Sequence, residues 1–181
     1  SNTEQTPASV NTSTCDLTHL FTQYGIRNNR IDFRQIMKYY DDTPVDEGIQ
    51  KEAEALVEGA QKTDVKTEYV CNDLRYFHAV RKMMEQYDCN AFTTPCKELC
   101  ASRIPWEKKF VPCLCHSLNK DDRIPSACEE DLAVWMAMMM MMYLTRQSVF
   151  MGNPVLVLKG SKTLEQLGMP NLLTQPGQTF D

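Results

Sequence analysis

The chain has 181 residues, of which 43% are hydrophobic and 24% are charged, and its formal net charge is −5. This length suits one domain of ordinary size, and the apolar content is sufficient for a packed core, which excludes a wholly disordered chain. The negative net charge argues against a nucleic-acid partner, because proteins that bind nucleic acids carry a basic footprint. The apolar run at 132–144 is well short of the roughly 20 residues that a membrane-spanning helix needs, so we expect no membrane partner.

The first part of the chain predicts a leader followed by two short helices. Residues 1–13 are polar, and we interpret them as a disordered leader, whose opening Ser-Asn pair matches the remnant of a cleaved purification tag. Helices are predicted at 18–24 and 33–40. We expect Gly25 to end the first helix and Asp32 to cap the second.

The middle and late parts of the chain predict alternating helices and strands. Residues 46–61 and 72–87 carry apolar side chains at helical spacing and predict two long amphipathic helices. Short apolar runs at 89–95, 110–116 and 155–158 predict strands. This alternation predicts an α/β fold, a three-layer sandwich in which helices flank a mainly parallel sheet.

The expected α/β domain covers residues 14–160, and residues 161–181 are interpreted as an irregular tail. A further long helix is predicted at 126–144 (SACEEDLAVWMAMMMMMYL). Ser126 and Glu129 have the spacing of a capping box. The acidic residues 129–131 then fall in the first turn, where the helix dipole favours negative charge. Five consecutive methionines follow, and we interpret them as core residues of a buried helix.

The chain contains eight cysteines, which we expect to be mostly buried, reduced thiols, because the apolar segments can form a core without disulfides. A disulfide framework is one alternative. A metal site is the other, based on the pairs Cys96-x3-Cys100 and Cys113-x-Cys115 with His116 alongside, although these spacings differ from those of a structural zinc knuckle. The cysteines are Cys15, Cys71, Cys89, Cys96, Cys100, Cys113, Cys115 and Cys128.

Three segments together resemble the central part of the L-fucose isomerase-like sugar isomerases. They are CNAFTTPCKEL, VPCLCHSLNKDDRIPSACEEDL and, after a long apolar helix, FMGNPVL. The most specific part is the Cys-Glu-x-Asp motif from Cys128 to Asp131, and the expected helices at 33–87 also follow the family's order. The matching residues are Asn90, Ala91, Glu98, Leu99, Pro112, Cys113, Ser117, Leu118, Asn119, Ile124, Ala127, Cys128, Glu129, Asp131, Phe150, Asn153 and Pro154.

The resemblance implies an isomerase that interconverts the aldose and ketose forms of a free monosaccharide, of the L-fucose or arabinose type, through an enediol. Such enzymes use a divalent ion, usually manganese (Mn2+), which chelates the sugar oxygens and which carboxylates suit as ligands. The resemblance implies that Asp131 is a catalytic metal ligand and that Glu98 is the second. Glu107 is the alternative to Glu98, because residues 103–110 resemble an insertion that would change the alignment. Asn119 occupies the place of a polar loop residue near the site. The resemblance also implies a cytoplasmic enzyme of carbohydrate metabolism that forms a homo-oligomer in its full-length form.

The chain departs from this family in one respect that concerns the site. The family's third metal ligand is a histidine in a later domain, and none of His19, His78 and His116 takes its place. We therefore expect a fragment that corresponds to the middle domain and the start of a missing C-terminal domain. Such a fragment would bind metal weakly and would not turn over sugar alone. His78 lies within a predicted amphipathic helix, where we expect it to have a partner or to lie at the surface.

Two further hypotheses remain open. The chain can be a non-catalytic α/β interaction domain that kept the fold and lost the chemistry. Convergence of Glu98 and Asp131 on one open cleft would favour the isomerase over that alternative. The other hypothesis is a thiol-based metal or redox protein built on the cysteines at 96, 100, 113 and 115.

Overall fold

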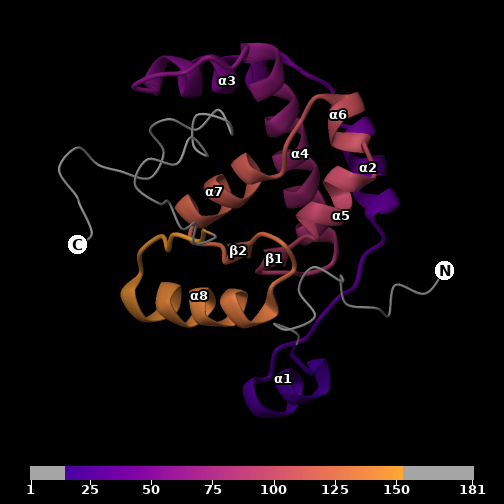
Figure 1. Cartoon of the computed structure of the whole chain (residues 1–181), viewed down its shortest axis with the longest axis vertical. Helices are drawn as coiled ribbons and strands as arrows, with labels where there is room; N and C mark the ends of the chain where they lie inside the picture. The colour runs from indigo at the N-terminus through magenta and orange to yellow at the C-terminus, as the bar shows by residue number, and fades with distance from the viewer. Residues whose placement is uncertain (1–14, 153–181) are drawn as a thin grey trace, which may run out of the picture. The chain divides into compact units, whose positions relative to one another are not determined.

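The computed structural model describes residues 15–152, and within them the chain forms eight helices and two short strands (Figure 1). The chain divides into one unit at Ser1–Met151 and a second at Gly152–Asp181, and all of these elements belong to the first unit. The elements are α1 (Leu17–Tyr24), α2 (Phe33–Asp41), α3 (Glu47–Gly59), α4 (Thr67–Gln86), β1 (Phe92–Thr93), α5 (Cys96–Ala101), α6 (Ile104–Lys108), α7 (Cys113–Asp121), β2 (Ser126–Ala127) and α8 (Leu132–Thr145). The leader predicted at 1–13, the strand predicted at 155–158 and the tail at 161–181 lie outside the described residues.

The predicted three-layer α/β sandwich is wrong, because the described part of the chain is mainly helical. Its two strands contain two residues each and pair in parallel, Phe92 with Ser126 and Thr93 with Ala127. The run at 89–95 does contain a strand, although a much shorter one. The run at 110–116 is not a strand: Pro112 caps α7, which begins at Cys113. Proline lacks a backbone N–H and is excluded from a central strand, whereas it is well tolerated at a helix start.

A first hydrophobic cluster is formed mainly by α2, α3 and α4, with α7 packed against α4. The buried side of α4 supplies most of its side chains, and Leu74, Ala79 and Val80 are fully buried there. Phe92 of β1 belongs to the same cluster. The amphipathic patterns at 46–61 and 72–87 therefore correspond to real helices. The second begins five residues earlier than expected, at Thr67.

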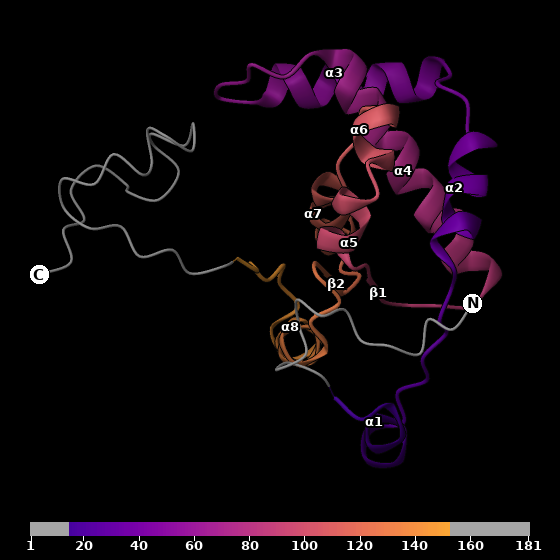
Figure 2. The ribbon, with the colours of Figure 1, turned by 45° about the vertical axis from the view of Figure 1, so that its right-hand side comes forward.

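A second, smaller cluster joins α1, α8 and β2 through Leu20, Trp135, Met138 and Ala127. Figures 1 and 2 show the strand pair between α7 and α8. The same two strands thus contribute to both clusters, since Phe92 packs in the first and Ala127 in the second.

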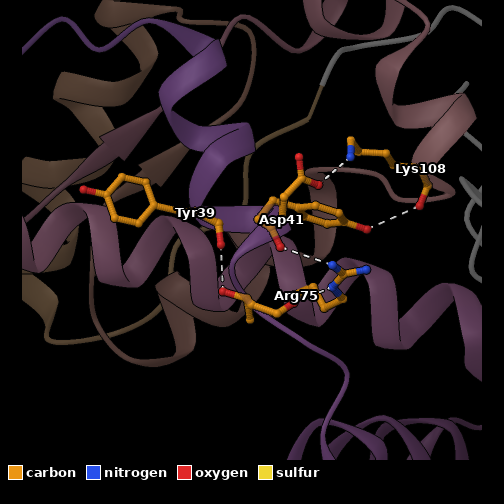
Figure 3. A network of polar contacts seen from close by, with 6 residues as sticks. Tyr39, Asp41, Arg75 and Lys108 are labelled. Carbon is orange, nitrogen blue, oxygen red and sulfur yellow. Dashed lines mark hydrogen bonds and ion pairs between the residues drawn. The ribbon is translucent and has the colours of Figure 1, made fainter.

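Polar contacts fix α2 against α4 and α6 (Figure 3). The Arg75 guanidinium of α4 donates hydrogen bonds to the carbonyl oxygens of Thr43 and Tyr40, at 2.7 and 3.2 Å, and lies over the Tyr40 ring. Lys108 of α6 pairs with Asp41 at 2.5 Å, and its carbonyl oxygen accepts a hydrogen bond from the Tyr40 hydroxyl. The Arg75 bonds thus add to the backbone N–H groups that already bond the Tyr40 carbonyl oxygen at the end of α2.

Two predictions about helix ends are confirmed. Gly25 ends α1 with φ of 70°, a left-handed conformation that glycine adopts without strain, and the Asp32 side chain caps α2. The capping box at Ser126 and Glu129 is wrong: Ser126 is fully buried in β2, and α8 begins six residues later with Asp131 as its N-cap.

The methionines of α8 are only partly core residues, which corrects the expectation of a fully buried helix. Met138 and Met142 are buried, whereas Met140 and Met141 are 43% and 52% exposed. The expected surface or partnered position of His78 is confirmed, because its Nε2 lies 2.9 Å from the Glu52 carboxylate. None of the helices between residues 15 and 152 combines the length and the apolar content needed to cross a bilayer.

Candidate functional site

The chemistry-bearing side chains gather where the two parallel strands end. Two residues separate the end of β1 from Cys96, the first residue of α5, and Cys128 directly follows β2. Because paired parallel strands end at the same edge, their register brings these two thiols together although they are far apart in sequence. α7, which contacts both α4 and β2, supplies His116 to the same place.

Cys96, His116 and Cys128 form a compact cluster, which we call the thiol–imidazole cluster. The Cys96 Sγ lies 3.6 Å from His116 Nε2. The three possible ligand atoms all lie within 4.8 Å of one another. Cys96 and His116 are buried and Cys128 is half-buried. Between residues 15 and 152, this is the one group of three or more His, Cys, Asp or Glu side chains close enough to share a metal ion.

Neighbouring side chains fix the orientation of His116. Its Nδ1 lies 2.8 Å from the Ser126 hydroxyl, which also accepts a hydrogen bond from the Asn119 amide at 3.2 Å. The Phe92 ring stacks on the imidazole, with 5.6 Å between the ring centroids. An Nδ1–H that donates to Ser126 leaves the Nε2 lone pair directed at Cys96. The cluster therefore presents two sulfur atoms and one imidazole nitrogen in a fixed arrangement.

Burial and mutual contact determine the protonation of this cluster. Burial lowers the pKa of His116 to about 4, so the ring is neutral near pH 7. The hydrogen bond with Cys96 lowers the pKa of the Cys128 thiol, and the same contact, together with burial, raises the pKa of Cys96. The pair therefore loses its first proton from Cys128, and Cys96 then donates to that thiolate.

The turn between β2 and α8 holds an unusual backbone. Glu129 and Glu130 both have positive φ, 66° and 54°, in two consecutive residues that are not glycine. Such conformations cost on the order of 1–3 kcal/mol each and occur preferentially where function requires them. Asp131 follows at once, and its Oδ1 accepts the hydrogen bond of the Val134 N–H at 3.0 Å. The turn thus places three successive acidic residues, 129–131, directly before α8.

The Glu130 carboxyl group has a raised pKa. It is half-buried, and burial raises its pKa, while the charge of Arg30 lowers it and that of Glu98 raises it. Glu98 of α5 therefore lies close enough to Glu130 to raise the pKa of Glu130. The Lys97 ammonium pairs with the Glu129 carboxylate at 3.4 Å, so α5 and the turn are linked through side chains of both signs.

The residues predicted from the resemblance occupy different environments. Asp131 caps α8, and Glu98 is exposed on α5, beside the turn that leads to Asp131. Glu107 is exposed on α6, a separate helix. Asn119 is fully buried and belongs to the support of His116. Whether Glu98 and Asp131 act as ligands or in catalysis stays a prediction.

The side chains present do not complete a manganese site. Among residues 15–152, neither Glu98 nor Asp131 belongs to a group of three or more ligand-type side chains that could share an ion, and the cluster that does converge offers sulfur and imidazole. Manganese prefers carboxylate, carbonyl and water oxygens, whereas thiolates suit softer or borderline ions. The described residues therefore disagree with the implied manganese.

Two members of the cluster, Cys96 and His116, are among the metal ligands that the sequence predicts, together with three other cysteines. The third member, Cys128, is not, because the sequence links it only to the Cys-Glu-x-Asp motif. Of those three cysteines, Cys115 is buried beside Asn119, whereas Cys100 and Cys113 are exposed. All eight cysteines are free thiols, and three are buried, so the expectation that most are buried is wrong. No local spacing identifies Cys128 as a partner of Cys96, since only the strand pairing joins them.

A separate depression of about 710 Å³ lies between α3 and α4. Its lining includes Glu52, His78, Arg81, Lys82 and Glu85, with charges of both signs. Neither the thiol–imidazole cluster nor the carboxylates at the start of α8 line this depression. It therefore adds nothing to the site at the strand ends.

Comparisons with protein-family models, with curated proteins and with solved structures find no match for this chain.

Proposed function

We propose that this chain is part of an aldose–ketose isomerase of the L-fucose isomerase-like type, which moves a proton between two sugar carbons through an enediol. The proposal rests first on the motif that resembles that family, from Cys128 to Asp131. The observation that carries it is the backbone at this motif, where two consecutive left-handed residues lead to Asp131 and Glu130 lies near Glu98.

The carboxylates at this turn have properties that proton transfer requires. A general acid–base group works best when its pKa approaches the operating pH, and burial raises the pKa of Glu130 in that direction. Asp131 is held in place by the Val134 N–H and remains available as a second carboxylate. In this proposal Glu130 takes the proton from C2 of the aldose and returns it to C1, while a hydroxyl proton moves between O1 and O2. Asp131 and Glu98 orient the sugar hydroxyls.

The rest of the proposal concerns the setting of the reaction. Free thiols at all eight cysteines support a reducing compartment, and we place the enzyme in the cytoplasm. Exposed apolar side chains at the end of α8, among them Tyr143 and Leu144, support association of copies into a homo-oligomer. The substrate is a free monosaccharide, and the proposal involves neither nucleic acid nor membrane.

Deuterium incorporation tests this proposal directly. The purified chain is incubated in D2O with L-fucose or L-arabinose, with and without manganese, and ketose formation and deuterium at C1 and C2 are followed by NMR. Because the fragment is expected not to complete turnover alone, the decisive readout is slow deuterium exchange at C2. We expect this exchange to fall roughly 100-fold or more in Glu130→Gln, because loss of a general acid–base group typically removes a factor of about 10²–10⁴. The Asp131→Asn variant, which keeps a hydrogen-bonding side chain, should lower the exchange less. Asp64→Asn, an exposed substitution of the same kind in a loop, is the matched control.

Two results would overturn the proposal. The first is an absence of deuterium exchange at C2 with either sugar, in the presence or absence of manganese. The second is exchange that survives unchanged in both variants, which would remove these carboxylates from the reaction. Circular dichroism of each variant separates loss of chemistry from loss of fold.

A further inference from the structure

The distances within the thiol–imidazole cluster match those around a tetrahedral zinc ion. Zinc binds cysteine sulfur at about 2.3 Å and histidine nitrogen at about 2.0–2.1 Å, so the two atoms lie roughly 3.6 Å apart at a tetrahedral angle. The Cys96 Sγ and the His116 Nε2 are 3.6 Å apart. Cys128 is the third member, with its sulfur within 4.8 Å of both atoms. A small inward movement of this sulfur completes three zinc ligands.

The surroundings of His116 are those of a metal ligand. A histidine that binds a metal through one nitrogen commonly donates the N–H of the other to a fixed acceptor, which sets the tautomer and the ring plane. Here the acceptor is the Ser126 hydroxyl at 2.8 Å, itself held by Asn119. Ser126 and Asn119 are both fully buried, and the Phe92 ring covers the imidazole. The side chains around His116 therefore already hold the imidazole in the orientation that a metal ligand needs.

We propose that Cys96, His116 and Cys128 bind one zinc ion, which ties the start of α5 to the end of β2. Two thiolates and an imidazole favour zinc over magnesium, calcium or manganese. Three protein ligands leave a fourth position, as in zinc sites that also hold water or a fourth side chain.

This inference is independent of the proposed isomerase. The zinc ligands are distinct from the carboxylates assigned to proton transfer, although Cys96 precedes Glu98 on α5 and Cys128 precedes the turn that ends at Asp131. A bound zinc ion therefore stabilises the relative position of α5 and that turn. Zinc binding and its effect on stability are measured without sugar, so failure of either proposal leaves the other in place.

The alternative chemistries of the same side chains are weaker. A catalytic thiol requires access for its substrate, and Cys96 and His116 are only 7% and 4% exposed. A disulfide between Cys96 and Cys128 would leave the oriented imidazole without a role. Both alternatives give results in the following experiment that differ from those of zinc binding.

The test uses the full chain, reduced and stripped of metal by a chelator, and titrated with zinc against a chromophoric competitor. We expect one zinc ion per chain and a higher midpoint of thermal unfolding once it is bound. Cobalt in place of zinc should give the absorption of a tetrahedral site with sulfur-to-metal charge transfer. Cys96→Ser, Cys128→Ser and His116→Ala should each weaken binding roughly 100-fold or more, and Ser126→Ala roughly 10- to 100-fold. Cys100→Ser, which removes an exposed thiol from the same helix as Cys96, should bind as the parent chain does.

Several outcomes would overturn the zinc site. One is the absence of stoichiometric binding by the reduced chain. Another is binding that stays equally tight in Cys96→Ser and Cys128→Ser. A third is rapid loss of exactly these two thiols to a disulfide that zinc does not slow, which would identify a redox pair. The Ser126→Ala variant keeps all three ligands, so its reduced affinity cannot be attributed to loss of a ligand.

Discussion

At the scale of single residues, the least expected group is the carboxyl of Asp73. It lies on the buried side of α4, and its Oδ1 accepts the Val111 N–H at 2.6 Å. Burial raises its pKa from 3.8 to about 6, and the Val111 hydrogen bond only partly opposes this shift. The folded chain therefore keeps a proton on Asp73 between about pH 4 and 6, where the unfolded chain has lost it.

This shift predicts a pH dependence of stability. Because the folded state binds more protons in that window, the Asp73 contribution to the free energy of unfolding falls as pH rises from about 4 to 6. His116 acts in the opposite sense, because its lowered pKa makes its contribution rise with pH over a similar range. The comparison with Asp73→Asn isolates the first effect, since the amide oxygen can still accept the Val111 N–H.

We expect the variant to gain stability relative to the parent chain, by at most about 3 kcal/mol, between pH 4 and 7. Urea unfolding at several pH values measures this difference. The exposed Asp64→Asn substitution should show no such trend. A constant difference between Asp73→Asn and the parent chain across the window would contradict the assignment.

Residue roles could be predicted from the sequence only where they depend on near neighbours. Gly25 and Asp32 act within one turn of a helix, and both were identified correctly. Ser126 was assigned to a helix cap from its spacing to Glu129, yet its hydroxyl serves His116 and Asn119. That role depends on the pairing of β1 with β2, which no local pattern encodes.

At the scale of elements, the start of α8 shows how competing caps are resolved. The sequence pattern predicts Ser126 as the N-cap and places Asp131 in the first turn, whereas Asp131 is the N-cap in the structure. Ser126 is drawn into the strand pair, and the strained residues Glu129 and Glu130 then redirect the chain before the helix begins. The element was therefore predicted correctly in kind, and its boundary was wrong by six residues.

The cap itself can be tested by two substitutions at one position. Asp131→Ala removes the acceptor for the Val134 N–H and should destabilise the chain by about 1 kcal/mol. Asp131→Asn keeps an acceptor oxygen and should change the free energy of unfolding by only a few tenths of a kcal/mol. Equal losses in the two variants, measured by urea unfolding, would show that capping is not what Asp131 contributes to stability.

The strand predicted at 110–116 is wrong for a different physical reason. A short apolar run is compatible with a buried strand or with one side of a helix, and periodicity alone does not separate them. Pro112 at the N-cap and the buried residues Cys115, His116 and Asn119 of α7 are consistent with a helix. The long periodic segments at 46–61 and 72–87 were free of this ambiguity.

At the scale of the whole molecule, the fold class was wrong because one predicted strand is a helix and another contains only two residues. The described residues pack as helices around two clusters, with only a two-residue parallel pair between them. What the resemblance implied about sugar chemistry stays a proposal. The proposal rests on the Cys-Glu-x-Asp motif and does not depend on the predicted sandwich.

The exposed apolar side of α8 predicts association between copies. Met141 is 52% exposed and Leu144 is 84% exposed, while the opposite side of the helix packs in the second cluster. A double substitution, Met141→Lys with Leu144→Lys, should lower the association constant at least tenfold, because lysine removes apolar contact and suits a helix C-terminus. Sedimentation over a wide range of chain concentration measures it.

The matched control for this prediction is Trp106→Lys. Trp106 is 85% exposed but lies on α6, away from the α8 surface. The Trp106→Lys substitution should leave the association constant unchanged. A parent chain that remains monomeric at every concentration would contradict the expected homo-oligomer, and so would a double variant that associates as strongly as the parent.

The parallel pairing of β1 with β2 also has a consequence for the order of folding. Thr93 and Ala127 meet across 34 residues, and closing a loop of that length is entropically unfavourable until other contacts offset it. Helices α3 and α4 pack across shorter separations, such as the 26 residues between Glu52 and His78, and can form first. The junction of α5, β2 and α8 should therefore assemble late, and an amide-exchange experiment should find its protection acquired after that of α4.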